Sequence, residues 1–219
     1  MRVWYAFLDL LFPIRCAACG VGGRALCQKC LEKAPSAAET GSASISALYR
    51  YEYPPIKKAL WALKYRNNRT PAEIFGTSLY EHLLEHAYEL TTFSRAPKDA
   101  AVIIVPIPLS KKRLRERGFN QSEKIIEECK RLDKNKSFLF ANDILCKTKE
   151  TAPQASTKDR PERLKNIRGC FAVANPEKVK NKVVIVVDDI TTTGATLREA
   201  ITALEHAGAA RAIGIAIAH

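Results

Sequence analysis

The sequence predicts an α/β fold in which a parallel sheet is flanked by helices, preceded by a small four-cysteine module. Two apolar runs, residues 182–187 and 212–218, enclose a helical stretch, and this order is typical of a βαβ unit. Four cysteines lie within residues 16–30 and form a separate pattern. A chain of 219 residues suffices for one such domain with an appendage, and its 47% hydrophobic content excludes a mostly disordered protein.

The first residues of the chain are apolar and raise the question of an export signal or a membrane anchor. Residues 3–12 are too short to span a bilayer, Asp9 interrupts them, and no small-residue cleavage site follows. We expect a short helix that packs on the rest of the protein, with a peripheral membrane contact as the alternative. Its packing residues would be Trp4, Phe7, Leu8 and Leu11. We expect no transmembrane segment and a cytoplasmic location.

The four-cysteine module consists of two Cys-x2-Cys pairs separated by seven residues. Each short loop lets two thiolates point the same way, so that both pairs can converge on one tetrahedral Zn²⁺ ion. The ligands would be Cys16, Cys19, Cys27 and Cys30. Four cysteines fill the coordination sphere, which indicates a structural zinc rather than a catalytic one. Two disulfides are disfavoured without an export signal, and an iron–sulfur cluster on the same thiolates is the alternative.

Composition sets the expected domain boundaries. Residues 1–35 would hold the N-terminal helix and the zinc-binding module, residues 36–46 a small polar linker, and residues 47–219 the main domain. At the start of the main domain, alternation over residues 47–53 predicts a strand, and a proline pair then opens a helix. This helix would bury Ile56, Leu60 and Leu63, and the next one Ile74, Phe75, Leu79, Leu83 and Leu84.

The second half of the chain predicts further strands and helices. Residues 101–105 form a β-branched run of the kind that is buried in a parallel sheet, and it ends at Pro106. Asn120 and Glu123 are spaced as a capping box that opens a helix. The apolar residues of that helix are Ile125, Ile126, Cys129 and Leu132. The chain then ends in the strand, helix and strand expected over residues 182–187, 194–206 and 212–218.

Two acidic residues stand where the strand over residues 182–187 ends. The strand would deliver Asp188 and Asp189 to the carboxyl edge of the sheet, where open α/β folds bind ligands. Adjacent carboxylates can accept hydrogen bonds from the vicinal hydroxyls of a ribose, and they can stabilise an oxocarbenium-like sugar in a transition state. The pair therefore predicts a ribose site in which both aspartates act as catalytic residues.

A threonine-rich turn follows the aspartates and enters the next helix. Backbone N–H groups and the helix dipole at such a helix N-terminus favour a phosphate. The binding residues would be Thr191, Thr192, Thr193, Gly194, Ala195 and Thr196. The alternative is a solvated acidic turn with an ordinary helix cap, which the specific order of residues disfavours. A P-loop nucleotide hydrolase is also disfavoured, because no lysine follows the glycine.

The sequence VVIVVDDITTTGAT over residues 183–196 resembles the motif with which type I phosphoribosyltransferases bind phosphoribosyl pyrophosphate (PRPP). The resemblance implies a type I phosphoribosyltransferase-like fold. It also implies that Asp188 and Asp189 bind the ribose hydroxyls, that residues 191–196 hold the 5′-phosphate, and that Mg²⁺ accompanies the pyrophosphate.

Other parts of the chain extend the resemblance to the ComF family. These parts are the four-cysteine start, LKYR at residues 63–66, PIPLSKKRLRERGFNQ at residues 106–121 and TKETAPQ at residues 148–154. The family is associated with natural transformation and DNA uptake. The resemblance therefore implies single-stranded DNA and other competence proteins as partners.

The formal net charge of +12 predicts a surface that attracts anions. One basic cluster follows Pro106 and would lie at the same sheet edge as the phosphate site. It comprises Lys111, Lys112, Arg113, Arg115 and Arg117. A second stretch comprises Lys158, Arg160, Arg163, Lys165 and Arg168. Both suit a pyrophosphate or a nucleic-acid backbone, but aromatic stacking partners are sparse nearby.

The histidines provide no metal-ligand pattern that we rely on. His82 and His86 are four residues apart on an expected helix, and we expect them to serve packing or solvation.

Two functions fit these features. One is an enzyme that transfers the phosphoribosyl group from PRPP to a nitrogen nucleophile and releases pyrophosphate. The other is a non-catalytic module that retains the PRPP site and handles single-stranded DNA. The enzyme should release pyrophosphate with some base, whereas the module should bind single strands with a steep salt dependence and no turnover.

Overall fold

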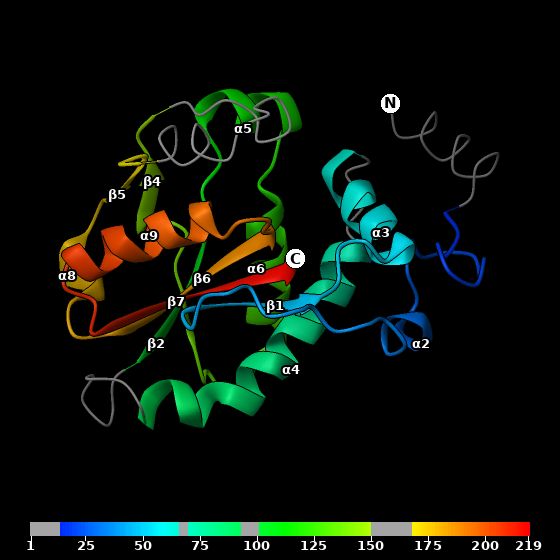
Figure 1. The fold of residues 1–219 in the computed structure, drawn as a ribbon, viewed down its shortest axis with the longest axis horizontal. Helices are drawn as coiled ribbons and strands as arrows, with labels where there is room; N and C mark the ends of the chain where they lie inside the picture. Colours follow the sequence, from blue (N-terminus) through cyan, green and yellow to red (C-terminus); the bar gives the residue numbers. More distant parts are fainter. Residues whose placement is uncertain (1–13, 66–69, 93–100, 150–167) are drawn as a thin grey trace.

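The computed structural model describes residues 14–65, 70–92, 101–149 and 168–219. Its main body is a parallel five-stranded sheet with helices on both faces (Figure 1). In spatial order the strands are β1 (Ile45–Tyr49), β7 (Arg211–Ala218), β6 (Val183–Ile190), β2 (Val102–Pro106) and β3 (Leu139–Phe140). This arrangement confirms the predicted fold class, a parallel sheet flanked by helices.

The central strand β6 connects through α9 (Ala195–His206) to its neighbour β7. This is the predicted strand, helix, strand unit. The strand continues beyond its predicted end, because Asp188 still pairs with Ala216 and Ile190 with Ala218 of β7. The two aspartates are therefore held within the sheet, and the turn begins only after them.

One face of the sheet is covered by α3 (Pro54–Tyr65), α4 (Thr70–Thr92) and α6 (Gln121–Leu132). The residues predicted to be buried in α3 are buried, and so are most of those predicted in α4. The prediction for Leu84 is wrong, because it is 45% exposed while the adjacent Leu83 is fully buried. Consecutive residues point about 100° apart on a helix, so both cannot face the sheet.

The other face of the sheet is covered by α9 together with three short elements. These are β4 (Leu145–Lys147), β5 (Phe171–Val173) and α8 (Pro176–Val179). Strands β4 and β5 form a separate antiparallel pair, which Figure 1 shows beside α9. Such short elements carry too few residues for a periodic pattern, so the sequence did not predict them.

The chain between β2 and α6 folds into the short helix α5 (Lys111–Arg117). Ser110 caps its start by accepting a hydrogen bond from the Arg113 backbone N–H at 3.4 Å. The helix α6 then begins as predicted, because Asn120 accepts a hydrogen bond from the Ser122 backbone N–H at 3.0 Å.

The four-cysteine module lies beside α3 and contains one short helix, α2 (Gln28–Leu31). Its Leu26 and Leu31 belong to the same buried cluster as Leu60 and Leu63 of α3. The module is therefore packed on the helix layer of the main domain.

Strand β1 covers residues 45–49, whereas alternation predicted a strand over residues 47–53. Residues 51–53 instead form the turn into α3, with the Tyr51 backbone N–H donating to the His219 carbonyl at 2.8 Å.

Two predictions lie outside the described residues. They are the helix over residues 3–12 and the basic residues Lys158, Arg160, Arg163 and Lys165. Among the helices that the structure describes, none is long and apolar enough to cross a membrane.

Candidate functional site

The acidic pair lies at the carboxyl end of β6, in the middle of the sheet. The Asp189 backbone N–H donates a hydrogen bond to Asp188 Oδ1 at 2.8 Å, which fixes the first carboxylate against the chain. Both residues are partly buried. The sheet thus holds two carboxylates at the edge where ligands bind in this class of fold.

Lys64, the lysine of the LKYR sequence, reaches the acidic pair from the end of α3. Its Nζ lies 2.8 Å from Asp189 Oδ2, a charge contact without a well-aligned hydrogen bond. Only 19% of the lysine side chain and 13% of the aspartate side chain are exposed, so solvent screens this pair less than a surface pair. No role for Lys64 was predicted from the sequence. The residue appeared there only as part of LKYR, one of the segments that resemble the ComF family.

The start of α6 contacts the other aspartate. Ser122 Oγ donates to Asp188 Oδ1 at 3.4 Å, and Ser122 is only 3% exposed. The neighbouring Gln121 is 2% exposed and accepts a hydrogen bond from Arg117 Nη1 at 2.8 Å. Within the described residues, Gln121 Nε2 has no hydrogen-bond partner. Gln121 therefore keeps a buried donor without an acceptor in the part of the chain that the structure describes.

Burial raises the pKa of the Asp188 carboxyl from an ordinary value of 3.8 to about 8, and the negative charge of Asp189 adds to the increase. The positive charge of Lys64 acts in the opposite direction. The surroundings of the ligand-free site therefore favour the protonated form of Asp188.

The predicted phosphate loop lies between β6 and α9, directly after the acidic pair. Thr191 is 5% exposed, and its backbone N–H donates to the Ala218 carbonyl at 2.9 Å. Gly194 has a φ of +72°, a conformation that favours glycine. Arg198 Nη2 donates to the Thr193 carbonyl at 2.7 Å and braces the turn. The loop is thus anchored at both ends.

The first turn of α9 faces the same end of the sheet as the aspartates. The helix does not itself use the N–H groups of its first residues, since its first internal bond runs from Arg198 N to the Gly194 carbonyl at 2.8 Å. Thr192 is exposed and Thr193 is half-buried, so both hydroxyls are accessible beside these N–H groups. This combination suits an anionic oxygen group.

All five residues of the predicted basic cluster lie on α5, which has no buried residue. The helix follows β2, whose end pairs with β6 at Pro106 and Val187. Arg117 connects this helix to the acidic site through Gln121, whereas Lys111 and Arg115 are exposed on the surface. Of the second basic stretch, the described residue Arg168 is also exposed.

The four cysteines of the module come together as predicted, and their Sγ atoms all lie within 4.8 Å of one another. Cys27 Sγ lies 3.8 Å from Cys16 Sγ and 3.7 Å from Cys19 Sγ. Four sulfurs at about 2.3 Å around a tetrahedral zinc are about 3.8 Å apart. The donor set and its spacing therefore fit one such ion.

The local fold explains why the cysteines converge. The Gly20 backbone N–H donates to the Cys16 carbonyl at 2.9 Å, and Gly20 has a φ of +76°, so the first pair sits on a tight turn. The second pair begins α2, where the Cys30 backbone N–H donates to the Cys27 carbonyl at 3.0 Å. Burial alone would raise the pKa of Cys16, but backbone N–H groups, including that of Cys27, lower it to about 6.

The phosphoribosyl transferase domain family matches residues 130–219. Competence protein ComFC of Bacillus subtilis is 33% identical over 123 residues, which are 56% of this chain and 46% of that protein. The match thus spans less than half of the Bacillus protein.

Two further matches cover more of this chain. DNA utilization protein YhgH of Escherichia coli is 28% identical over 184 residues, which are 84% of this chain and 73% of that protein. A solved structure described as the allosteric regulatory enzyme of purine biosynthesis covers 72% of this chain and 30% of its own, with 16% identity and a TM-score of 0.39. That structural likeness is too distant to bear on function. The competence and DNA utilization relatives, together with the phosphoribosyl transferase domain over residues 130–219, support the resemblance of this chain to the ComF family of phosphoribosyltransferase-like proteins.

Proposed function

We propose that this protein binds PRPP together with Mg²⁺ at the carboxyl edge of its sheet, and that it serves DNA uptake in natural transformation. The observation that carries the proposal is the placement of the acidic pair directly before the phosphate loop at the start of α9. The names of the relatives, competence protein and DNA utilization protein, support the link to DNA. The protein works in the cytoplasm, where four clustered thiols stay reduced and bind a structural zinc.

In this site each part of PRPP meets a different group. The 5′-phosphate is held by residues 191–196, and the two ribose hydroxyls donate to Asp188 and Asp189. Carboxylate oxygens are ligands that Mg²⁺ accepts, and the ion would neutralise part of the pyrophosphate charge. Arg117 and the other cations of α5 attract the pyrophosphate to this edge.

Lys64 makes the site responsive to the ligand. In the ligand-free protein its ammonium group neutralises Asp189 at 2.8 Å. A ribose hydroxyl that donates to the same carboxylate would share it with the lysine. The acidic pair thus accepts a polyanionic ligand without leaving two uncompensated carboxylates beside it.

The proposed reaction is transfer of the phosphoribosyl group to a nitrogen nucleophile. The bond between the sugar carbon and pyrophosphate breaks first, and the sugar develops positive charge in the transition state. The aspartate carboxylates stabilise this charge through the ribose hydroxyls. Pyrophosphate takes the bonding electrons as it leaves, and the nucleophile then bonds to the same carbon and gives up its proton to water.

The experiment that tests the proposal compares PRPP binding by the zinc-loaded protein and by a variant carrying Asp188→Ala and Asp189→Ala. We expect the variant to lose binding at least about a hundredfold, because two hydrogen-bonded charges contribute about 1.5 to 3 kcal/mol each. Asp143→Asn is the matched control, since Asp143 is an exposed acid that pairs with Lys178. Equal PRPP affinity in the double variant and the wild type would refute the site.

A second candidate function is the handling of single-stranded DNA, and α3 provides the observation that favours it. Trp61 is 55% exposed on this helix, and Lys57 and Lys58 are exposed one turn before it. An exposed indole beside cations can stack on a base. Trp61 would thus be an aromatic stacking partner, a kind of residue that is sparse near the basic clusters in the sequence. The DNA surface would run from α3, past the acidic site, to α5.

Mutations can distinguish PRPP binding from single-stranded DNA binding. Trp61→Ala should weaken binding of an oligothymidylate about tenfold, because stacking on one base contributes about 1 to 3 kcal/mol, and it should leave PRPP affinity unchanged. The Asp188 and Asp189 double variant should show the reverse pattern. If both ligands are lost together in a folded variant, PRPP and DNA share one site and the assignment of α3 to DNA is wrong.

A further inference from the structure

A second cluster of metal-binding side chains lies on α4, away from the cysteine module. His82, Glu85 and His86 occupy positions i, i+3 and i+4, which lie on one face of a helix. One ligand atom from each residue lies within 4.8 Å of the others. The centroids of the two imidazole rings are 4.5 Å apart. Two histidines one turn apart are an arrangement that binds zinc-class ions on helices.

The surroundings of His82 favour its neutral form, which is the form that binds metals. Both histidines are half-buried and Glu85 is exposed. Burial lowers the pKa of His82, with the neighbouring His86 acting in the same direction and Glu85 opposing. A neutral imidazole offers a lone pair to a metal ion, and the carboxylate of Glu85 supplies a negative charge for a divalent cation.

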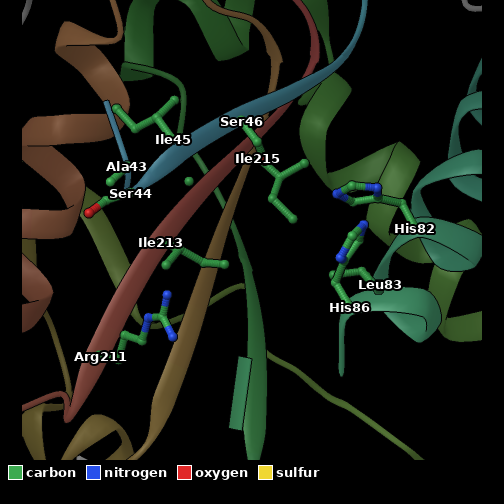
Figure 2. A pocket seen from close by; sticks show the side chains of 11 residues that line it. Ala43, Ser44, Ile45, Ser46, His82, Leu83, His86, Arg211, Ile213 and Ile215 are labelled. Atoms are coloured by element: carbon green, nitrogen blue, oxygen red, sulfur yellow. The ribbon is translucent and has the colours of Figure 1, made fainter. Parts of the chain in front are cut away.

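The histidines line a cavity between α4 and the strands β1 and β7. Figure 2 shows the His82 ring pointing from α4 toward Ile215 of β7, with the His86 ring next to the His82 ring. The cavity measures about 210 Å³, which suffices for a metal ion with its water ligands and a small anion, but not for a nucleotide. Three protein ligands leave at least one coordination position open for such a small molecule.

The opposite part of this cavity contains a guanidinium group with one nitrogen that lacks a hydrogen-bond partner among the described residues. Arg211, at the start of β7, lines the cavity, and its Nη1 is buried with no hydrogen-bond partner among the described residues. A buried guanidinium nitrogen without an acceptor is unfavourable unless a ligand supplies one. An oxyanion that completes the metal coordination would also provide this acceptor.

We propose that His82, Glu85 and His86 bind a divalent transition-metal ion of the zinc class, and that a small oxyanion such as phosphate joins this ion to Arg211. The site is separate from the acidic site. Its cavity is lined by residues of α4, of β7 and of the chain around β1, and the lining does not include Asp188, Asp189 or Lys64.

The test uses the full chain with its cysteine module already loaded with zinc. Cobalt is then added, because cobalt bound by nitrogen and oxygen gives weak visible bands without the intense near-ultraviolet band of cobalt bound by thiolates. We expect one further equivalent of cobalt with the nitrogen and oxygen spectrum. We also expect a rise in melting temperature of about 5 °C at saturating zinc, since a ligand that binds only the folded state stabilises it.

Variants with one histidine replaced test which residues bind the second metal ion. His82→Gln and His86→Gln should each weaken this second equivalent at least about tenfold while the zinc of the module is retained. His206→Gln is the matched control, because His206 is an exposed histidine on α9. Absence of a second equivalent in the folded wild type, or its persistence in both histidine variants, would overturn the metal site.

The anion is tested by adding inorganic phosphate. Phosphate should tighten cobalt binding several-fold in the wild type and have no such effect in Arg211→Gln, whose cobalt affinity without phosphate should equal that of the wild type. If phosphate tightens binding equally in Arg211→Gln, the role of Arg211 is wrong. If phosphate has no effect in the wild type, the oxyanion part of the proposal is wrong.

Discussion

Asp188 and Asp189 are consecutive residues, yet the fold gives their carboxylates different partners. Asp189 faces Lys64 of α3, and Asp188 accepts from the backbone and from Ser122 of α6. The sequence predicted that the pair would lie at the sheet edge, because a buried strand ends there. It could not predict Lys64 or Ser122 as partners, since both come from helices far away along the chain.

Asp188→Asn should stabilise the ligand-free protein, by an amount that grows with pH. The folded-state pKa of about 8 lies above the ordinary 3.8, so the folded protein binds this proton more tightly than the unfolded chain. The contribution of Asp188 to stability is complete below about pH 4 and is lost as the pH rises toward 8. At pH 8 we expect a gain of about 1 kcal/mol, which corresponds to about 2 to 4 °C in melting temperature.

Thermal unfolding at pH 5 and pH 8 checks this prediction. The difference in melting temperature between the variant and the wild type should be larger at pH 8. A constant difference, or one that shrinks as the pH rises, would show that Asp188 is not held in its protonated form by its surroundings.

The turn that joins β6 to α9 depends on one glycine. Gly194 has a φ of +72°, and a Cβ there would lie 3.1 Å from Ile45 Cδ1 and 3.3 Å from Arg198 Nη2. The sequence predicted this glycine only as one of the phosphate-binding residues. The structure adds that β1 and the guanidinium of Arg198 also crowd the position.

Gly194→Ala should destabilise the protein by about 1 to 2 kcal/mol and weaken PRPP binding, because the left-handed conformation is costly for alanine and Arg198 must move. Denaturant unfolding and PRPP titration measure the two effects. Gly41→Ala is the control, since Gly41 has a φ of +68° but no atom within 4 Å of its added Cβ. Unchanged PRPP affinity in Gly194→Ala would mean that the loop does not hold the ligand.

The elements that sequence analysis predicted are those with long patterns. The strand and helix pattern over residues 182–218 was confirmed as β6, α9 and β7, apart from the longer end of β6. The elements it missed, such as β3 and β5, have two and three residues. Such elements are held by contacts with other parts of the fold, and a local pattern cannot reveal them.

At the scale of the whole molecule, the cysteine module and the acidic site are connected through α3. The module packs on α3 through Leu26 and Leu31, and the same helix carries Lys64 to Asp189. The sequence predicted the four metal ligands from their spacing. It could not predict which helix they would pack against, nor the order of the strands, because both depend on contacts between distant segments.

Loss of the zinc ion that we propose for the module should therefore weaken the acidic site. Cys27→Ser should abolish the bound zinc, lower the melting temperature and weaken PRPP binding about tenfold, which corresponds to about 1.4 kcal/mol. Cys146→Ser is the control, because Cys146 is an exposed cysteine on β4. Metal analysis, thermal unfolding and PRPP titration measure the three effects. An unchanged PRPP affinity in the metal-free variant would show that α3 holds its position without the module.

Calorimetric titration of the zinc-loaded protein with PRPP and Mg²⁺ tests the central claim most directly. We predict saturable binding with a micromolar dissociation constant and one site per chain, and no such binding when PRPP is replaced by ribose 5-phosphate without the pyrophosphate. Binding of PRPP would justify screening nitrogen bases for pyrophosphate release. Absence of PRPP binding at millimolar concentration would contradict the proposed site and make single-stranded DNA handling the leading function.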